Sequence, residues 1–250
     1  MSYTYNKNCF ENKTYNSAFL SSAFLRGMAF GKGVSEFEGD IAIMSIKNKK
    51  DIFLAVKKAY IDMSPRTFEK DKDWWKDPKN VKITKSGNPK EERLKAVEES
   101  WQKDKREIFE WLADEFYTYF QNDCTDFSDW HKTVCSKFLN KFKPILSEYG
   151  YDAEKSLKYG KAQKIVNMTF KYLLCFDDAE NYGEKFDVCH MPIDSYILNW
   201  YNDSGENKCT VAWSDLEKEQ YYKIQEDIKN ILVGYNPFLA EFYIWAEYNR

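Results

Sequence analysis

The sequence has few of the residues that build metal centres. It contains only two histidines, His131 and His190, and its cysteines form no Cys-x-x-Cys pair. Zinc sites usually combine closely spaced cysteines and histidines, and iron–sulfur clusters need a compact set of cysteines. We therefore expect no metal site, no iron–sulfur cluster and no other cofactor. The six cysteines lie apart, at positions 9, 124, 135, 175, 189 and 209, which favours free thiols in a reducing cytoplasm.

The sequence also lacks a net positive charge and a long apolar run. Its formal net charge is −3, so any contact with nucleic acid has to use a local basic patch. No segment approaches the roughly 20 apolar residues that a membrane-spanning helix needs. The stretch from Ser17 to Phe30 has the small, apolar character of a signal peptide, but Arg26 interrupts it and glycines follow. We expect a buried helix there, and a cytoplasmic protein without a membrane segment.

Aromatic residues are abundant, at 18% of the 250 positions. Apolar residues recur at steps of three and four through most of the chain, which is the spacing of one face of a helix. This pattern predicts helices over 51–63, 91–120, 152–158 and 216–233, another that Ser128 caps and that ends near Pro144, and a last one that Pro237 opens. The chain length fits one domain or two closely packed subdomains. The sequence therefore predicts a mostly α fold.

Residues 66–93 differ in character from their surroundings. Lysine and aspartate alternate around Trp74 and Trp75, and Pro78 and Pro89 interrupt any regular element. We expect a loop-rich insertion with a short strand over 81–84. The tryptophan pair either stacks on a nucleic-acid base or anchors the insertion to the core, and the second role is the commoner one.

Two short strings carry the chemistry. The first is Gly160-Lys161-Ala162-Gln163-Lys164-Ile165-Val166-Asn167, and the second is Met191-Pro192-Ile193-Asp194-Ser195-Tyr196-Ile197. A glycine-led tight turn is expected to open a helix with Lys164 in its first turn, and a proline-marked entry to open a second helix with Asp194 in its first turn. One amine and one carboxylate are thereby placed at two helix starts.

The order of these strings resembles the helix-hairpin-helix (HhH-GPD) superfamily of DNA glycosylases, of the endonuclease III and 8-oxoguanine DNA glycosylase type. Gly160 matches the first hairpin glycine, and Lys164 matches the lysine of members that also cut the abasic strand. Pro192 to Ser195 match the family's Pro-Val-Asp-Thr string, so Asp194 falls on its essential aspartate.

The chain departs from the family's pattern in several places. Ala162 replaces the second hairpin glycine, Tyr159 stands where proline is usual, and Tyr196 replaces a histidine. The lysine and the aspartate are also further apart in sequence than is usual. We place the extra length in the polar segment from Asp177 to Asp187, because lengthening a surface loop costs little free energy.

The resemblance implies two helical subdomains that flank a cleft containing the hairpin and the aspartate. Residues 1–65 would form an N-terminal helical part that packs with the C-terminal helices of 203–250. Residues 94–202 would form the other subdomain, with the hairpin at 157–176 and the aspartate helix at 192–201. The implied activity is that of a monomeric DNA glycosylase, which flips a damaged or modified base out of double-stranded DNA and cleaves its N-glycosidic bond.

The two motif residues have distinct expected roles. Asp194 would stabilise the positive charge that develops on the deoxyribose, and its ordinary alternative is to cap a helix. Lys164 would attack the sugar and form a Schiff base if the enzyme is also an abasic-site lyase, and its alternative is a solvated helical lysine.

A cationic segment surrounds these residues. Lysines 155, 158, 161, 164 and 171 follow one another without an intervening carboxylate, which predicts either a phosphate-binding surface or a solvated helical face. The expected DNA-binding residues are Lys158, Gly160, Lys161, Ala162, Gln163 and Lys171. His190, with Trp74 and Trp75, is a candidate for the base pocket, and a purely structural histidine is the alternative.

Several readings of function remain open at this point. A glycosylase of this type would serve base-excision repair or defence against phages with modified bases. One alternative is a DNA-binding module that has kept the hairpin and lost the chemistry. Another is an all-α protein-interaction domain in which both strings are only caps and turns.

Overall fold

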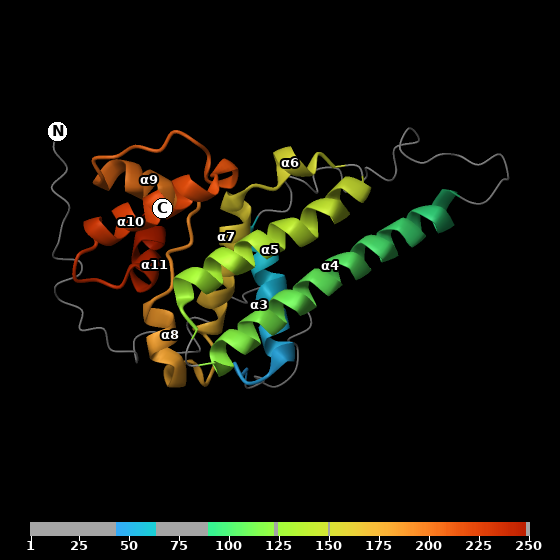
Figure 1. The fold of residues 1–250 in the computed structure, drawn as a ribbon, viewed down its shortest axis with the longest axis horizontal. Helices are drawn as coiled ribbons and strands as arrows, with labels where there is room; N and C mark the ends of the chain where they lie inside the picture. The colour runs from blue at the N-terminus through green and yellow to red at the C-terminus, as the bar shows by residue number, and fades with distance from the viewer. Residues whose placement is uncertain (1–43, 64–89, 123–124, 150, 249–250) are drawn as a thin grey trace.

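The computed structural model describes residues 44–63, 90–122, 125–149 and 151–248, with only the backbone of residues 90–97 (Figure 1). Within these ranges the chain forms helices and no strands, which confirms the predicted mostly α fold. The expected strand at 81–84 and the pair Trp74 and Trp75 lie outside the described residues. The helices are α3 (Lys49–Asp62), α4 (Lys90–Gln121), α5 (Phe127–Glu148), α6 (Ala153–Ser156), α7 (Tyr159–Leu173), α8 (Gly183–Asp187), α9 (Ser195–Ser204), α10 (Lys218–Ile231) and α11 (Pro237–Tyr248), with 3₁₀ turns η5 (Ala179–Tyr182) and η6 (Trp213–Asp215).

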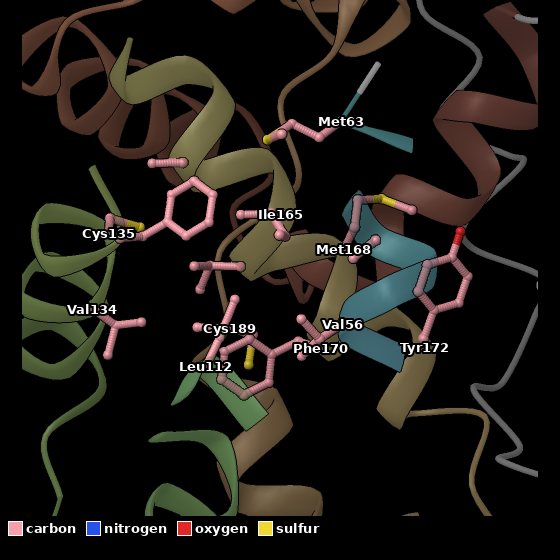
Figure 2. Close-up of a cluster of buried hydrophobic side chains, with 14 of the residues drawn as sticks. Val56, Met63, Leu112, Val134, Cys135, Ile165, Met168, Phe170, Tyr172 and Cys189 are labelled. Atoms are coloured by element: carbon pink, nitrogen blue, oxygen red, sulfur yellow. The ribbon is translucent and has the colours of Figure 1, made fainter. Parts of the chain in front are cut away.

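Helix α7 lies at the centre of the fold. Helices α3, α4 and α5 lie on one side of it, and α9, α10 and α11 are grouped at the other end of the molecule (Figure 1). α7 packs against α3, α5 and α10, and α9 packs against α11. Figure 2 shows Val56 of α3, Leu112 of α4 and Val134 of α5 around Ile165 and Phe170 of α7. α7 therefore joins the two groups of helices.

Helix α3 is the described portion of the predicted N-terminal part. It follows the amphipathic pattern predicted for 51–63, and Ile52, Val56 and Ala59 lie in the core. Its main neighbours are α4 and α7. The expected contact of residues 1–43 with 203–250 lies outside the described residues.

Helix α5 differs from its prediction at both ends. The side chain of Asp126, rather than that of Ser128, caps it by accepting a hydrogen bond from the N–H of Asp129 at 2.9 Å. The helix continues through Pro144, where the prediction ended it. Pro144 is exposed, so the hydrogen bond that it cannot donate is missing on the solvent side, while the buried face of the helix continues without a break.

The segment 177–187 was predicted to be a polar loop and is mostly helical, as η5 and α8. Its first two carboxylates bind the backbone that leads into α3. Asp177 accepts a hydrogen bond from the N–H of Met44 at 2.9 Å, and Asp178 accepts one from the N–H of Ile46 at 2.8 Å. The acidic residues therefore fix the start of α3 against the end of α7, a contact that no local pattern predicts.

The C-terminal helices begin close to where the sequence places them. Pro237 opens α11, as predicted. α10 starts at Lys218, two residues after the predicted start, and follows a capping box in which Glu217 and Gln220 bind each other's backbone N–H groups. Among the described residues, no helix is long and apolar enough to cross a membrane.

Candidate functional site

The structure brings Lys164 and Asp194 together. Lys164 Nζ lies 2.8 Å from Asp194 Oδ2, and the two side chains are only 6% and 13% exposed. The residues come from different elements, Lys164 from the second turn of α7 and Asp194 from the residue before α9. The sequence had placed both at helix starts, but their contact is a property of the tertiary structure.

Asp194 divides its two oxygens between two tasks. Oδ1 accepts hydrogen bonds from the backbone N–H groups of Tyr196 and Ile197, both at 3.0 Å, and so caps α9. Oδ2 accepts from Lys164. The capping role is thus confirmed, and it holds the second oxygen in a fixed orientation beside the amine, close to the positive end of the α9 dipole.

Gln163 holds the two halves of this site in register. Its Nε2 donates to the carbonyl oxygens of Gly160 and Ile193, both at 2.8 Å, and its Oε1 accepts from the N–H of Ile193 at 3.2 Å. Ile193 directly precedes Asp194, so this buried amide ties the backbone of the carboxylate-bearing segment to α7. Gln225 of α10 adds a hydrogen bond to the carbonyl of Met191 at 2.7 Å.

Gly160 lies inside the first turn of α7, so the predicted glycine-led turn is wrong. Its N–H donates to the carbonyl of Leu216 at 2.9 Å. A Cβ at this position would lie 1.8 Å from the carbonyl oxygen of Trp213. The glycine is therefore required for the close approach of the η6 backbone, a role for which local sequence gives no signal.

A buried polar network lies beside the ion pair. His190 Nδ1 is 2.9 Å from the Tyr221 hydroxyl, which also accepts from Asn167 Nδ2 at 2.9 Å. His131 Nε2 is 3.0 Å from Asn167 Oδ1. Asn167 Nδ2 also donates to Gln163 Oε1 at 3.0 Å, which joins the network to the site. His190 thus has structural partners, and its predicted place in a base pocket stays a prediction.

Burial keeps both histidines of the network neutral. It lowers the pKa of His131 from 6.5 to about 3, against a smaller opposing effect of the hydrogen bond to Asn167. Burial, followed by the neighbouring His131, places the pKa of His190 well below its usual value. The network therefore contains two uncharged rings, that of His131 on α5 and that of His190 in the segment between α8 and α9.

The other lysines of the cationic segment do not form one exposed patch. Every residue of α7 except Lys171 is buried, and a buried charge needs a partner. Lys155 is exposed, and the Glu217 carboxylate, through its hydrogen bond, raises the pKa of Lys158 above the usual value. The partners are Glu217 for Lys158 at 2.9 Å, the Ser156 carbonyl for Lys161 at 2.5 Å and Glu241 for Lys171 at 2.5 Å. Contact with DNA stays a prediction for all six residues expected to make it, which are Lys158, Gly160, Lys161, Ala162, Gln163 and Lys171.

No cluster of three or more histidine, cysteine, aspartate or glutamate side chains within the described ranges has the geometry of a metal site. The chain matches no protein-family model, no curated protein and no solved structure in the comparisons. The chemistry of the site therefore has to be argued from its own geometry.

Proposed function

We propose that the protein is a DNA N-glycosylase that acts on a base flipped out of double-stranded DNA, with Asp194 and Lys164 as its catalytic residues. The observation that carries this proposal is the shielded contact of 2.8 Å between Lys164 Nζ and Asp194 Oδ2. It supplies, at one point, the carboxylate and the amine that cleavage of an N-glycosidic bond can use.

The fixed carboxylate suits the first step of the reaction. As the bond between the sugar C1′ and the base nitrogen breaks, its electron pair leaves with the base and positive charge develops on the sugar. A carboxylate held by two backbone N–H groups needs no reorganisation to face that charge. In a shielded site this interaction is stronger than it would be in water.

The amine suits a second step. The hydrogen bond between Lys164 and Asp194 allows the ammonium proton to pass to Oδ2, which leaves an electron pair on Nζ. The free amine then forms a bond to C1′. The C1′–O4′ bond breaks and O4′ takes up a proton that Nζ gives up, which leaves a Schiff base between Lys164 and the sugar. Loss of a proton from C2′ of this intermediate then forms a C2′–C3′ double bond and expels the 3′ phosphate with the electron pair of the C3′–O bond, which would give the lyase activity.

A purely structural ion pair is the competing explanation. A buried pair often adds little net stability, and replacing it with apolar residues is frequently neutral. What favours catalysis here is the way the protein constrains Asp194, since Gln163 and the α9 cap both restrict its backbone.

The test is base release from duplexes that contain 8-oxoguanine, uracil, 5-hydroxycytosine or glucosylated hydroxymethylcytosine. We expect the wild type to release one of these bases, and Asp194→Asn, which retains the helix cap, to lose at least about 100-fold in rate. Lys103→Ala is the control, because Lys103 is an exposed lysine of α4 that lies outside the cationic segment.

Borohydride trapping on the duplex whose base is released tests the role of the Lys164 amine. A covalent adduct with the wild type that is absent with Lys164→Gln would assign Lys164 as the nucleophile. Base release without any adduct would restrict the activity to hydrolysis. A folded protein that binds DNA but releases no base would contradict the proposed function and favour the non-catalytic module.

A further inference from the structure

A second lysine–carboxylate pair lies on α7, two helical turns from Lys164. Lys171 Nζ is 2.5 Å from Glu241 Oε2 of α11, and Glu241 is completely buried. The other oxygen, Oε1, is also buried and has no hydrogen-bond partner among the described residues. A buried carboxylate oxygen without a donor costs free energy, so such an atom calls for an explanation.

Half-buried aromatic rings surround this pair. Lys171 Nζ lies 4.5 Å from the ring centroid of Phe242 and 5.7 Å from that of Trp245. Trp245 in turn contacts Tyr196, with ring centroids 5.9 Å apart and nearly perpendicular planes. The group therefore combines flat apolar surfaces, one cation and one buried acceptor.

The aromatic group is continuous with the candidate catalytic site. Tyr196 is the second residue after Asp194, and its N–H binds Asp194 Oδ1 at 3.0 Å. Lys164 and Lys171 are seven positions apart on one face of α7, which corresponds to about 10 Å along the helix axis. An extruded nucleotide whose sugar lies at Lys164 would therefore extend its base toward Glu241 and Trp245.

We propose that Glu241 and Trp245 are specificity-determining residues that read the extruded base. This inference rests on the proposed glycosylase function and adds the class of base to it. The ring of Trp245 stacks on the base, and Glu241 Oε1 accepts a hydrogen bond from an N–H group on the edge of the base. An ionised carboxylate only accepts hydrogen bonds, so it favours a base with an amino group and repels one with a carbonyl at that position.

Lys171 has a supporting role in this assignment. Its ammonium group neutralises Glu241 through Oε2 and leaves Oε1 for the substrate. The contact of Lys171 with the Phe242 ring also limits how far the lysine can move from the carboxylate.

The experiment compares base release within two matched pairs of duplexes. One pair carries 5-hydroxycytosine or 5-hydroxyuracil, which differ by an amino group in place of a carbonyl. The other pair carries 8-oxoguanine or 8-oxohypoxanthine, which differ by the presence of the 2-amino group. We expect the wild type to release the amino member at least about tenfold faster in one of the pairs, because leaving a buried polar group unpaired is penalised strongly.

The informative variant is Glu241→Gln, whose amide can donate as well as accept. We expect it to lose about tenfold of the preference for the amino base while base release itself persists. Glu247→Gln is the matched control, since Glu247 is an exposed glutamate of the same helix. If Glu241→Gln does not fold, the double variant Lys171→Met with Glu241→Leu removes the whole pair without leaving an unpaired charge.

The outcomes separate this inference from the proposed function. The inference would be overturned, and the proposed function would stand, if the wild type released both members of each pair at the same rate. The same holds if the preference for the amino member persisted in both Glu241 variants. No release from these four duplexes would also overturn the inference. Release from the uracil duplex would then show that glycosylase activity stands by itself, whereas no release from any duplex would overturn both.

Discussion

The two buried histidines predict that the protein loses stability as the pH falls below 7. His131 and His190 are the only histidines in the chain, and burial places the pKa of both below the usual 6.5, that of His131 at about 3. As the pH falls through 6.5, the unfolded chain binds protons at these rings and the folded protein does not. Protonation therefore favours the unfolded state. The loss of stability continues until the pH reaches the pKa values that the two histidines have in the folded protein.

The size of the effect follows from the two pKa values of His131. At about pH 7.5 both states are almost unprotonated, and the difference is below about 0.1 kcal/mol. At about pH 5.5 the unfolded ring is mostly protonated, which removes about 1.4 kcal/mol of unfolding free energy. Burial also places the pKa of His190 well below the usual value, so His190 adds to this loss in the same direction.

Urea unfolding of the wild type at these two pH values, followed by circular dichroism, measures the loss. The double variant His131→Gln with His190→Gln keeps hydrogen-bonding groups for Asn167, Tyr222 and Tyr221 but cannot titrate in this range. We expect its stability to fall by at least about 1.4 kcal/mol less between the two pH values than that of the wild type. An equal fall in both proteins would refute the conclusion that the folded state keeps the rings neutral.

Three further predictions concern stability. Gly160→Ala should destabilise the fold by at least about 3 kcal/mol, because its Cβ would meet the backbone of η6. Gly183→Ala, which has open space around its Cβ, is the control in the same thermal melt. Equal melting temperatures for the two variants would contradict the close approach of η6 to Gly160. Gln163→Leu should lower the free energy of unfolding in urea by about 2 to 4 kcal/mol, because it leaves buried backbone groups of Ile193 unpaired. A loss under about 0.5 kcal/mol would argue that the hydrogen bonds of Gln163 to Ile193 do not hold this segment against α7. Asn236→Ala should cost about 1 kcal/mol, since its side chain accepts from the N–H of Leu239 at the start of α11, whereas Asn236→Asp should retain most of that stability.

The ion pairs of the cationic segment limit which of its lysines can bind DNA phosphates in the proposed function. Most lysines of the cationic segment neutralise carboxylates of the same chain. A phosphate that binds Lys158 must compete with Glu217, which lies 2.9 Å from it. The exposed Lys155 forms no ion pair with a carboxylate of the described residues, so it is the simplest phosphate contact on this segment.

The sequence by itself determined where most of the described helices lie and, for several of them, where they begin. The periodic apolar residues of 51–63 and 91–120 predict α3 and α4 to within one or two residues. Asp152 and Asp194 were expected at helix starts, and both cap the helix that follows. These predictions succeed because capping and amphipathic spacing depend on residues within one or two turns.

The tertiary structure alone decided which distant residues meet. Lys164 and Lys171 are both helical lysines in the sequence, and only the packing of α7 against the segment before α9 and against α11 gives them buried carboxylate partners. The sequence predicts that Gly160 is a turn residue, and only the structure shows that the backbone of Trp213 lies against it. Glu241 lies in an apolar helix with no local sign that one of its oxygens is left without a donor. Each of these contacts joins elements far apart in the chain, so their geometry depends on how the helices pack and not on any pattern within one of them.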